Sequence, residues 1–412
     1  MEKLVTTESM LMPRYVSRFA CIGSDCEDAC CSVWRVGLDE PTLLQYEASQ
    51  DPELRPIIEK YVRRNPKPQT TLDYGHIEKR ETPCQECPFL DESRLCRIQA
   101  KLGEEALSDA CDSFPRNTVL CGDFHQMVLR LSCPEAARLA LLEADAFDMD
   151  VSEASVRTGT IERIAPRFGL SMGEMEDIRT QLFQILQTRE LDLSRRLAVM
   201  GVFCQRLTEL LQQDKGANIQ GLFKTMDAVM ENGALQIPLK PLNAREYTRA
   251  KFAWSHLAAM RNTAVSPHQR KVLDAVASGL SIPADGSPDE AGLMRGLELG
   301  TARLEVALLG APWLLEHYLF NEALSEVFPW SEKTPYRHFI NLILGFTLLR
   351  VMLVGRAASQ EATLTPQELV DTVQVFCKKT QHGAEGTKIV DWLSPGFNLG
   401  DATSLGTLLM VI

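Results

Sequence analysis

The sequence has little positive charge and no apolar segment at its start. Among its 412 residues, 43 are Lys or Arg and 55 are Asp or Glu, which gives a formal net charge of -12. Such a chain is a poor candidate for neutralising the phosphates of nucleic acid. The opening residues, MEKLVTTESMLMPRY, lack the apolar core of a secretory signal. We therefore expect a cytoplasmic protein without nucleic-acid partners.

The sequence also lacks a clear membrane span. Its most apolar stretch, 339–354, is short for a span and contains Asn341 and Arg350. A buried helix explains it better, so no membrane partner is expected.

Two familiar cofactor motifs are missing as well. No glycine-rich turn follows a predicted strand in the manner of a nucleotide-binding fingerprint. Gly292, Gly296 and Gly300 recur every fourth residue inside a probable helix, a pattern typical of close helix packing. A radical S-adenosylmethionine motif, C-x3-C-x2-C, would need a third cysteine after Cys26 and Cys30 where Val33 stands. A Rossmann-type donor pocket and radical chemistry are therefore not indicated.

Cysteine, by contrast, is abundant and unevenly placed. Ten of the twelve cysteines lie in the first 133 residues. Disulfides rarely persist in a reducing compartment, so thiols gathered in this way indicate a metal or redox centre. Cys121 stands apart, and the other nine form three groups: Cys21, Cys26, Cys30 and Cys31; Cys84, Cys87 and Cys96; and Cys111 and Cys133. The isolated Cys204 and Cys377 are typical of small apolar core residues.

The spacing of these thiols leaves two metals open. Thiolates are soft ligands that select zinc or iron–sulfur clusters. A four-thiolate zinc site usually has two C-x2-C knuckles, and only Cys84–Cys87 has that form here. The spacing alone therefore favours an iron–sulfur cluster over zinc, which stays the alternative, and we expect a cluster of the 4Fe-4S type.

Periodicity divides the chain into two parts. Before residue 135, frequent prolines interrupt any long pattern, and only short helices at 39–49, 51–63 and 134–144 and a short strand or turn at 74–79 are predicted. Beyond 145, helical periodicity predicts helices at 174–188, 192–213, 217–231, 243–261, 267–279, 292–309, 313–327, 335–357 and 366–380. Thr334 and Thr365, each followed by proline, are the expected caps of the last two. We predict a mainly α protein with an irregular cysteine-rich module (1–140) and an all-α helical body (141–412) that carries the substrate or partner surface.

Several strings of the chain form a recognisable combination: CIGSDCEDACC, CPFLDESRLCRIQ, LSDACDSFPR and LSCPEAARL, followed in the helical body by EHYLFNEALSEVFPW. Together they resemble the flagellin lysine N-methylase family, with His317 in place of the asparagine of that family's E-N-Y-L-x-N segment. The resemblance covers nearly the whole chain. It implies a CxxxCC zinc- or iron-chelating module whose eight cysteines correspond to Cys21, Cys26, Cys30, Cys31, Cys87, Cys96, Cys111 and Cys133.

The resemblance also implies a function, namely N-methylation of flagellin lysines with S-adenosylmethionine as the methyl donor. Such a reaction needs a neutral amine, although lysine is almost fully protonated at neutral pH. Tyr318 and Asn321 lie three residues apart on one predicted helical face, and Glu316 is close by. These three residues are candidates for orienting and deprotonating the amine, but an ordinary apolar stripe would produce the same spacing. Two other functions stay open: a non-enzymatic iron–sulfur or zinc protein that binds a partner, and a redox protein.

Overall fold

The computed structural model describes residues 5–381 except 33–34, 71, 83–84, 214–218, 232–256, 265 and 284–288. The chain forms two compact units. One combines Met1–Ile164 with Met260–Asp274 and Val373–Gly383, and the other combines Ala165–Ala259, Ala275–Thr372 and Ala384–Ile412. Each unit is described on its own below.

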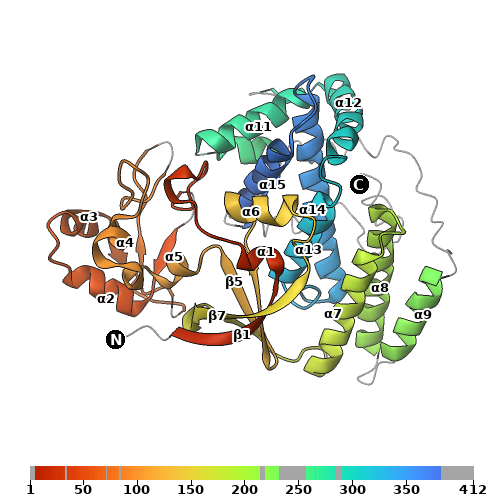
Figure 1. The fold of residues 1–412 in the computed structure, drawn as a ribbon, viewed down its shortest axis with the longest axis horizontal. Helices are drawn as coiled ribbons and strands as arrows, with labels where there is room; N and C mark the ends of the chain where they lie inside the picture. Colours follow the sequence, from red (N-terminus) through yellow and green to blue (C-terminus); the bar gives the residue numbers. More distant parts are fainter. Residues whose placement is uncertain are drawn as a thin grey trace. The chain divides into compact units, whose positions relative to one another are not determined.

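The first unit contains a five-stranded mixed sheet with strand order β7-β1-β6-β5-β8. β1 (Val5–Pro13) pairs antiparallel with β7 (Met149–Arg157) along its whole length, and the two strands run side by side in Figure 1. β5 (Arg116–Cys121) and β6 (Phe124–Leu129) form a hairpin, and β8 (Glu162–Ile164) lies parallel to β5. The short helix α1 (Arg14–Ser17) follows β1, and α6 (Pro134–Leu142) follows β6.

A second, three-stranded antiparallel sheet in this unit has the order β2-β4-β3. Its strands are β2 (Val36–Leu38), β3 (Val62–Arg64) and β4 (Gly75–Ile77), and α2 (Glu40–Ala48) and α3 (Leu54–Tyr61) lie between β2 and β3 in the chain. An apolar core joins these elements with α4 (Arg97–Leu102), and the partly buried Cys31, Cys96 and Cys111 pack against it. The unit is completed by α5 (Asp109–Ser113) and the 3₁₀ turns Gly23–Asp25, Glu104–Ala106 and Thr158–Thr160.

The fold class predicted for the N-terminal part was therefore wrong in one respect. The predicted short helices and the short strand at 74–79 are present, but the region is α/β with two sheets, not irregular. β7 and β8 also lie beyond residue 140, in the stretch for which only helices were expected. The reason is physical: β2, β3, β4 and β8 have three residues each, too few to show a period.

The second unit is helical, as predicted. Its helices include α7 (Met172–Gln187), α8 (Leu193–Gln213), α9 (Ile219–Glu231), α12 (Glu290–Leu308), α13 (Leu314–Ser325) and α14 (Pro335–Ala358). α8 packs against α7, α9 and α14, and α13 packs against α7 and α14. Figure 1 shows α7, α8 and α9 as neighbours. Helix α11 (Pro267–Gly279) and helix α15 (Pro366–Gln381) are each divided between the two units. Most of the predicted helix 243–261 lies outside the described residues.

Helix α14, which contains the apolar stretch 339–354, is a core helix. It is long and apolar enough to cross a membrane by length and composition, and 72% of its most apolar window is buried inside the protein. Thr334 caps it by accepting a hydrogen bond from the backbone N–H of Arg337 at 3.1 Å. Thr365 caps α15 in the same way, with the backbone N–H of Glu368 donating at 3.3 Å. Both predicted caps are confirmed.

The predicted packing role of the repeated glycines is confirmed too. A methyl group placed on Gly296 would lie 2.3 Å from the carbonyl oxygen of Gly279, and one on Gly300 would lie 2.2 Å from that of Val354. These distances are shorter than van der Waals contact, so α12 approaches its neighbours through positions where no side chain fits. The glycines serve helix packing, as their spacing indicated.

Candidate metal centre

The first cysteine group lies in a loop that begins with the 3₁₀ turn Gly23–Asp25. The thiol of Cys26 points to the carbonyl oxygen of Asp28 at 3.7 Å, and the Sγ atoms of Cys30 and Cys31 lie 3.9 Å apart. Cys21, at the start of the loop, is exposed. We call residues 26–32 the cysteine loop.

The second group is joined to this loop by backbone hydrogen bonds. The N–H of Cys87 donates to the carbonyl oxygen of Cys31 at 2.8 Å, and Ser32 pairs with Glu86 in an isolated β-bridge. A second bridge, between Leu90 and Cys96, closes the CPFLDESRLC segment into a tight hairpin. Cys87 and Cys96 are therefore carried on one turn beside the cysteine loop. Cys84 lies outside the described residues.

The third group lies at two helices. Cys111 is in α5, where its backbone N–H donates to the capping hydroxyl of Ser108 at 3.3 Å. Cys133 is the N-cap of α6, followed by Pro134 at the first helical position. Burial of the thiol raises the pKa of Cys133 and outweighs the backbone N–H groups of Ala136 and Glu135, which act at this helix N-terminus to lower it.

Electrostatic interactions link seven of the eight predicted ligands. Cys31 interacts electrostatically with Cys30, Cys87 and Cys111, and Cys111 also interacts with Cys96. Cys133 interacts with Cys26 and Cys30, which extends the set to the start of α6. These interactions connect all three sequence groups, which span more than a hundred positions of the chain.

The donor set is rich in thiols, which both predicted metals, zinc and an iron–sulfur cluster, accept. Among the described residues, no group of three or more Cys, His, Asp or Glu side chains is arranged to hold one metal ion. One tetrahedral zinc would need its thiolates about 3.8 Å apart, given Zn–S bonds of about 2.3 Å, and the Sγ atoms of Cys30 and Cys31 lie 3.9 Å apart. A four-iron cluster binds one thiolate at each of four irons and so suits a wider set of donors. The identity of the metal stays a prediction.

Burial keeps most of these thiols protonated in the absence of metal. It raises the pKa of Cys26 to about 11 and those of Cys111 and Cys133 to about 12. Cys30 differs because a hydrogen bond from Cys31 lowers its pKa. Metal binding at this centre would therefore release protons from the buried thiols.

Three polar side chains that the sequence did not indicate hold the cysteine loop. Lys378 forms a buried ion pair with Asp28, with 3.0 Å between Nζ and Oδ2. Gln374, one turn earlier on α15, donates to Asp28 Oδ2 at 3.1 Å and to the carbonyl oxygen of Ser132 at 2.9 Å. Asp28 and Lys378 are 350 positions apart, so no local pattern could have connected them. All of these residues belong to the first unit.

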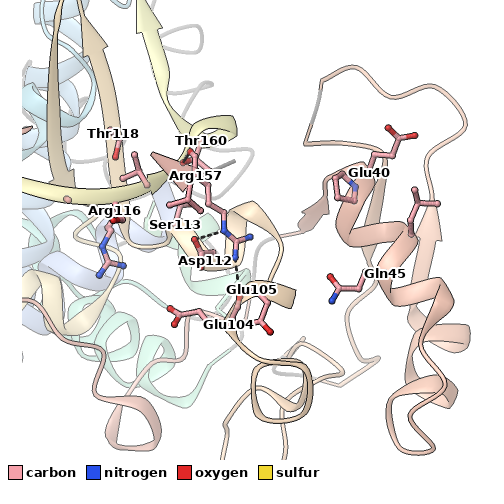
Figure 2. A pocket seen from close by; sticks show the side chains of 16 residues that line it. Glu40, Gln45, Glu104, Glu105, Asp112, Ser113, Arg116, Thr118, Arg157 and Thr160 are labelled. Carbon is pink, nitrogen blue, oxygen red and sulfur yellow. Dashed lines mark hydrogen bonds and ion pairs between the residues drawn. The ribbon is translucent and has the colours of Figure 1, made fainter. Parts of the chain in front are cut away.

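A groove of about 1220 Å³ lies in the same unit (Figure 2). Its lining includes Glu40, Glu104, Glu105 and Asp112, and Asp112 directly follows Cys111 on α5. In Figure 2, Arg157 lies among the carboxylates of one wall and is paired with Asp112 at 2.8 Å. The groove has a surplus of negative charge and could accept a cation. Because carboxylates stabilise the ammonium form, it suits binding a lysine rather than deprotonating it.

The candidates Glu316, Tyr318 and Asn321 are all buried in α13. Glu316 accepts hydrogen bonds from Arg189 Nη2 at 2.8 Å and Arg196 Nη1 at 2.6 Å. Burial alone would raise the pKa of Glu316, but these hydrogen bonds outweigh it and leave the pKa below its ordinary value. A carboxylate with a lowered pKa is a weak proton acceptor.

Tyr318 has 2% of its surface exposed and stacks on Phe346 with 6.1 Å between ring centroids. Asn321 is fully buried. These positions agree with an apolar stripe, the alternative that the sequence left open. A catalytic role for the three residues stays a prediction.

Fold and site together define a protein with converging cysteine thiols in an α/β unit and a second unit built of helices. The FliB lysine N-methylase C-terminal domain matches residues 179–394, more than half of the chain. The chain therefore belongs to the FliB lysine N-methylase family. No solved structure shows a significant match.

Three curated relatives are similar over about 168 residues. Lysine-N-methylases of Salmonella typhimurium and Salmonella choleraesuis are 38% and 37% identical over 168 residues, which are 41% of this chain and 39% of each relative. The flagellar biosynthetic protein FliU of Salmonella muenchen is 35% identical over 167 residues, 40% of this chain and 95% of that protein. The matched part thus spans well under half the length of the two lysine-N-methylases.

Proposed function

We propose that this protein is a lysine N-methyltransferase that acts on flagellin, with S-adenosylmethionine as the methyl donor and a cysteine-bound iron–sulfur cluster as a resident cofactor. The family match carries the proposal of lysine methylation. The name of the FliU relative, a flagellar biosynthetic protein, supports a flagellar substrate. We further propose that the reaction takes place in the cytoplasm, where flagellin subunits are met before export.

The chemistry sets three requirements for the site. The amine must lose its proton, the donor sulfur, methyl carbon and amine nitrogen must align, and water must be kept away. The acidic groove would act before methyl transfer, by binding a positively charged segment of the substrate. When bound, a cluster at the converging thiols would supply iron as an anchoring point for the donor. The chain's own contribution there is to hold the thiols of three distant segments together.

The test is a transfer assay with the full chain purified without oxygen. Flagellin incubated with the protein and S-adenosylmethionine is expected to gain methyl mass on lysines, as read by peptide mass spectrometry. Iron, acid-labile sulfide and zinc are measured on the same sample. A protein that carries its metal but neither binds S-adenosylmethionine nor changes flagellin would contradict methylation and favour a partner-binding or redox protein. If the sample holds one tightly bound zinc and no sulfide, the resident metal is zinc and not an iron–sulfur cluster.

Tyr318→Phe tests the proposed catalytic helix directly. The substitution removes the hydroxyl and keeps the ring that stacks on Phe346, so packing is preserved. If the phenol takes part in removing the proton of the amine, turnover falls by about 100- to 10,000-fold at unchanged metal content, the range expected for a general acid–base group. Wild-type turnover would assign Tyr318 to the core alone. Glu316→Gln is less informative, since it also breaks the contacts with Arg189 and Arg196.

A further inference from the structure

We infer that helix α15 is part of the metal centre, with Lys378 as a positioning residue that fixes the cysteine loop in its ligand-presenting conformation. The inference rests on the metal centre proposed above. It concerns residues that lie far from the cysteines in sequence. Lys378 is inside the matched C-terminal family domain, whereas the loop it holds is outside that match.

The contacts of Lys378 saturate its ammonium group. An ammonium has three N–H donors. The nearest acceptors of Nζ are the carbonyl oxygen of Ala29 at 2.8 Å, Asp28 Oδ2 at 3.0 Å and the hydroxyl of Ser32 at 3.3 Å. All three belong to the cysteine loop and surround Cys30 and Cys31 in sequence. Losing the ammonium would therefore release the loop at three points.

Burial makes this contact specific. The side chains of Lys378 and Asp28 are 3% and 0% exposed. A charge removed from water must be paired and hydrogen-bonded, so the loop has few alternative conformations that satisfy it. Since the pair is internally neutral, its contribution to the centre is geometry and not net charge.

Gln374 connects the cysteine loop to a second segment, the one that carries the predicted ligand Cys133. Its amide joins Asp28 to the carbonyl oxygen of Ser132, the residue before Cys133. One face of α15 therefore sets the cysteine loop and the start of α6 relative to each other. Arg138 on α6 adds a further tie, with 2.7 Å between its Nη2 and Glu27 Oε1.

The neighbouring Lys379 provides a matched control. It lies on the same helix, is 4% exposed, and donates to the carbonyl oxygen of Thr263 at 2.6 Å rather than to the cysteine loop. Lys378→Met and Lys379→Met thus remove the same group from similarly buried positions, and only the first frees the loop.

The experiment compares metal retention in the full chain purified without oxygen. Iron, sulfide and zinc per chain are measured, together with the half-time of metal loss to a chelator. We expect Lys378→Met to lose metal about tenfold faster or more, the usual effect of removing a group that orients a ligand, and Lys379→Met to behave as wild type. Circular dichroism checks that both variants keep their helical content.

The double variant Asp28→Asn/Lys378→Met separates positioning from charge repair. It removes the unpaired carboxylate, so folding recovers, but the carbonyl of Ala29 still lacks its donor. We expect metal loss to stay fast. Wild-type retention in the double variant would show that Lys378 only neutralises Asp28, and wild-type retention in Lys378→Met alone would overturn the inference while leaving the metal centre intact. A wild-type chain without any metal would overturn both, whereas methyl transfer to flagellin is read independently.

Discussion

At the level of single residues, the clustered cysteines could be recognised from the sequence, but the side chains that hold the cysteine loop could not. The cysteines were identifiable because thiols are rare and their grouping is visible in one dimension. Electrostatic interactions link seven of the eight, and their role as metal ligands stays a prediction. Lys378 could not be found in this way because a lysine near a helix end ordinarily faces solvent. Its importance arises from a contact between distant parts of the chain.

Burial of a histidine makes the stability of the protein pH-dependent. His338 packs edge-on against Phe328 with 5.1 Å between ring centroids. Burial lowers its pKa from 6.5 to about 4, Arg167 acts in the same direction, and Glu326 and Glu332 oppose the shift. In the unfolded chain His338 therefore binds a proton near pH 6.5, whereas in the folded chain it stays neutral until the pH falls to about 4. The contribution of His338 to the free energy of unfolding is therefore fully present above pH 6.5 and is lost as the pH drops towards 4.

Replacing this histidine should flatten the acid side of the stability profile. Over the interval given by the two pKa values, the loss for the wild type amounts to about 3 kcal/mol. In His338→Gln this part of the dependence should vanish. Urea unfolding at several pH values between 7.5 and 4.5 measures the effect. If the free energies of unfolding of the two proteins change in parallel with pH, the pKa of His338 is not lowered by folding.

At the level of elements, helices were predictable and most strands were not. Long helices repeat their apolar period several times, and α8 and α14 appear close to the predicted bounds. β1 and β7 are long enough to be detected, but both alternate mainly exposed and half-buried residues, so neither has a clear apolar face. Their partnership joins residues such as Val5 and Arg157 that are remote in sequence. Pairing of this kind is a property of the folded chain.

The glycines of α12 give a prediction at this scale. Gly300→Ala would place a methyl group 2.2 Å from the carbonyl oxygen of Val354, a rigid backbone atom. The helices must separate to accept it, at a cost of about 1–3 kcal/mol or more in the free energy of unfolding. Gly173→Ala, in α7, is the control because nothing lies within 4 Å of the added methyl.

The control should be neutral or slightly stabilising, since alanine favours helix over glycine by up to about 1 kcal/mol. Thermal or urea unfolding of both variants measures the difference. Equal stability of the two variants would mean that α12 and α14 can move apart freely. Such a result would remove the packing explanation for glycines at every fourth position.

For the whole molecule, the division of the chain into units does not follow sequence order. The unit with the cysteines includes Met260–Asp274 and Val373–Gly383, two segments from within the stretch predicted as the helical body. Whether 1–140 and 141–412 act as separate domains stays a prediction. The contacts of Gln374 and Lys378 with Asp28 and Ser132 join segments of this unit that are far apart in the sequence.

Metal removal should therefore loosen three stretches of sequence, one of them far from the other two. In the proposed centre, bound metal would join the thiols of the cysteine loop, the 87–96 hairpin, α5 and the start of α6, and Lys378 ties α15 to the cysteine loop. Without metal, buried neutral thiols remain and the segments lose their common anchor. We expect faster hydrogen exchange in residues 26–32, 85–96 and 373–381, measured by mass spectrometry on the protein with and without its metal.

Helix α14 is the internal reference for this experiment. It is buried by α8, α12 and α13, which carry no proposed metal ligand. Its exchange should stay slow in both states, because the contacts that protect it are apolar and independent of the thiols. Faster exchange along the whole chain would mean that the metal organises both units. Faster exchange confined to residues before 140 would mean that α15 contacts the cysteine loop but keeps its own structure when the metal is lost.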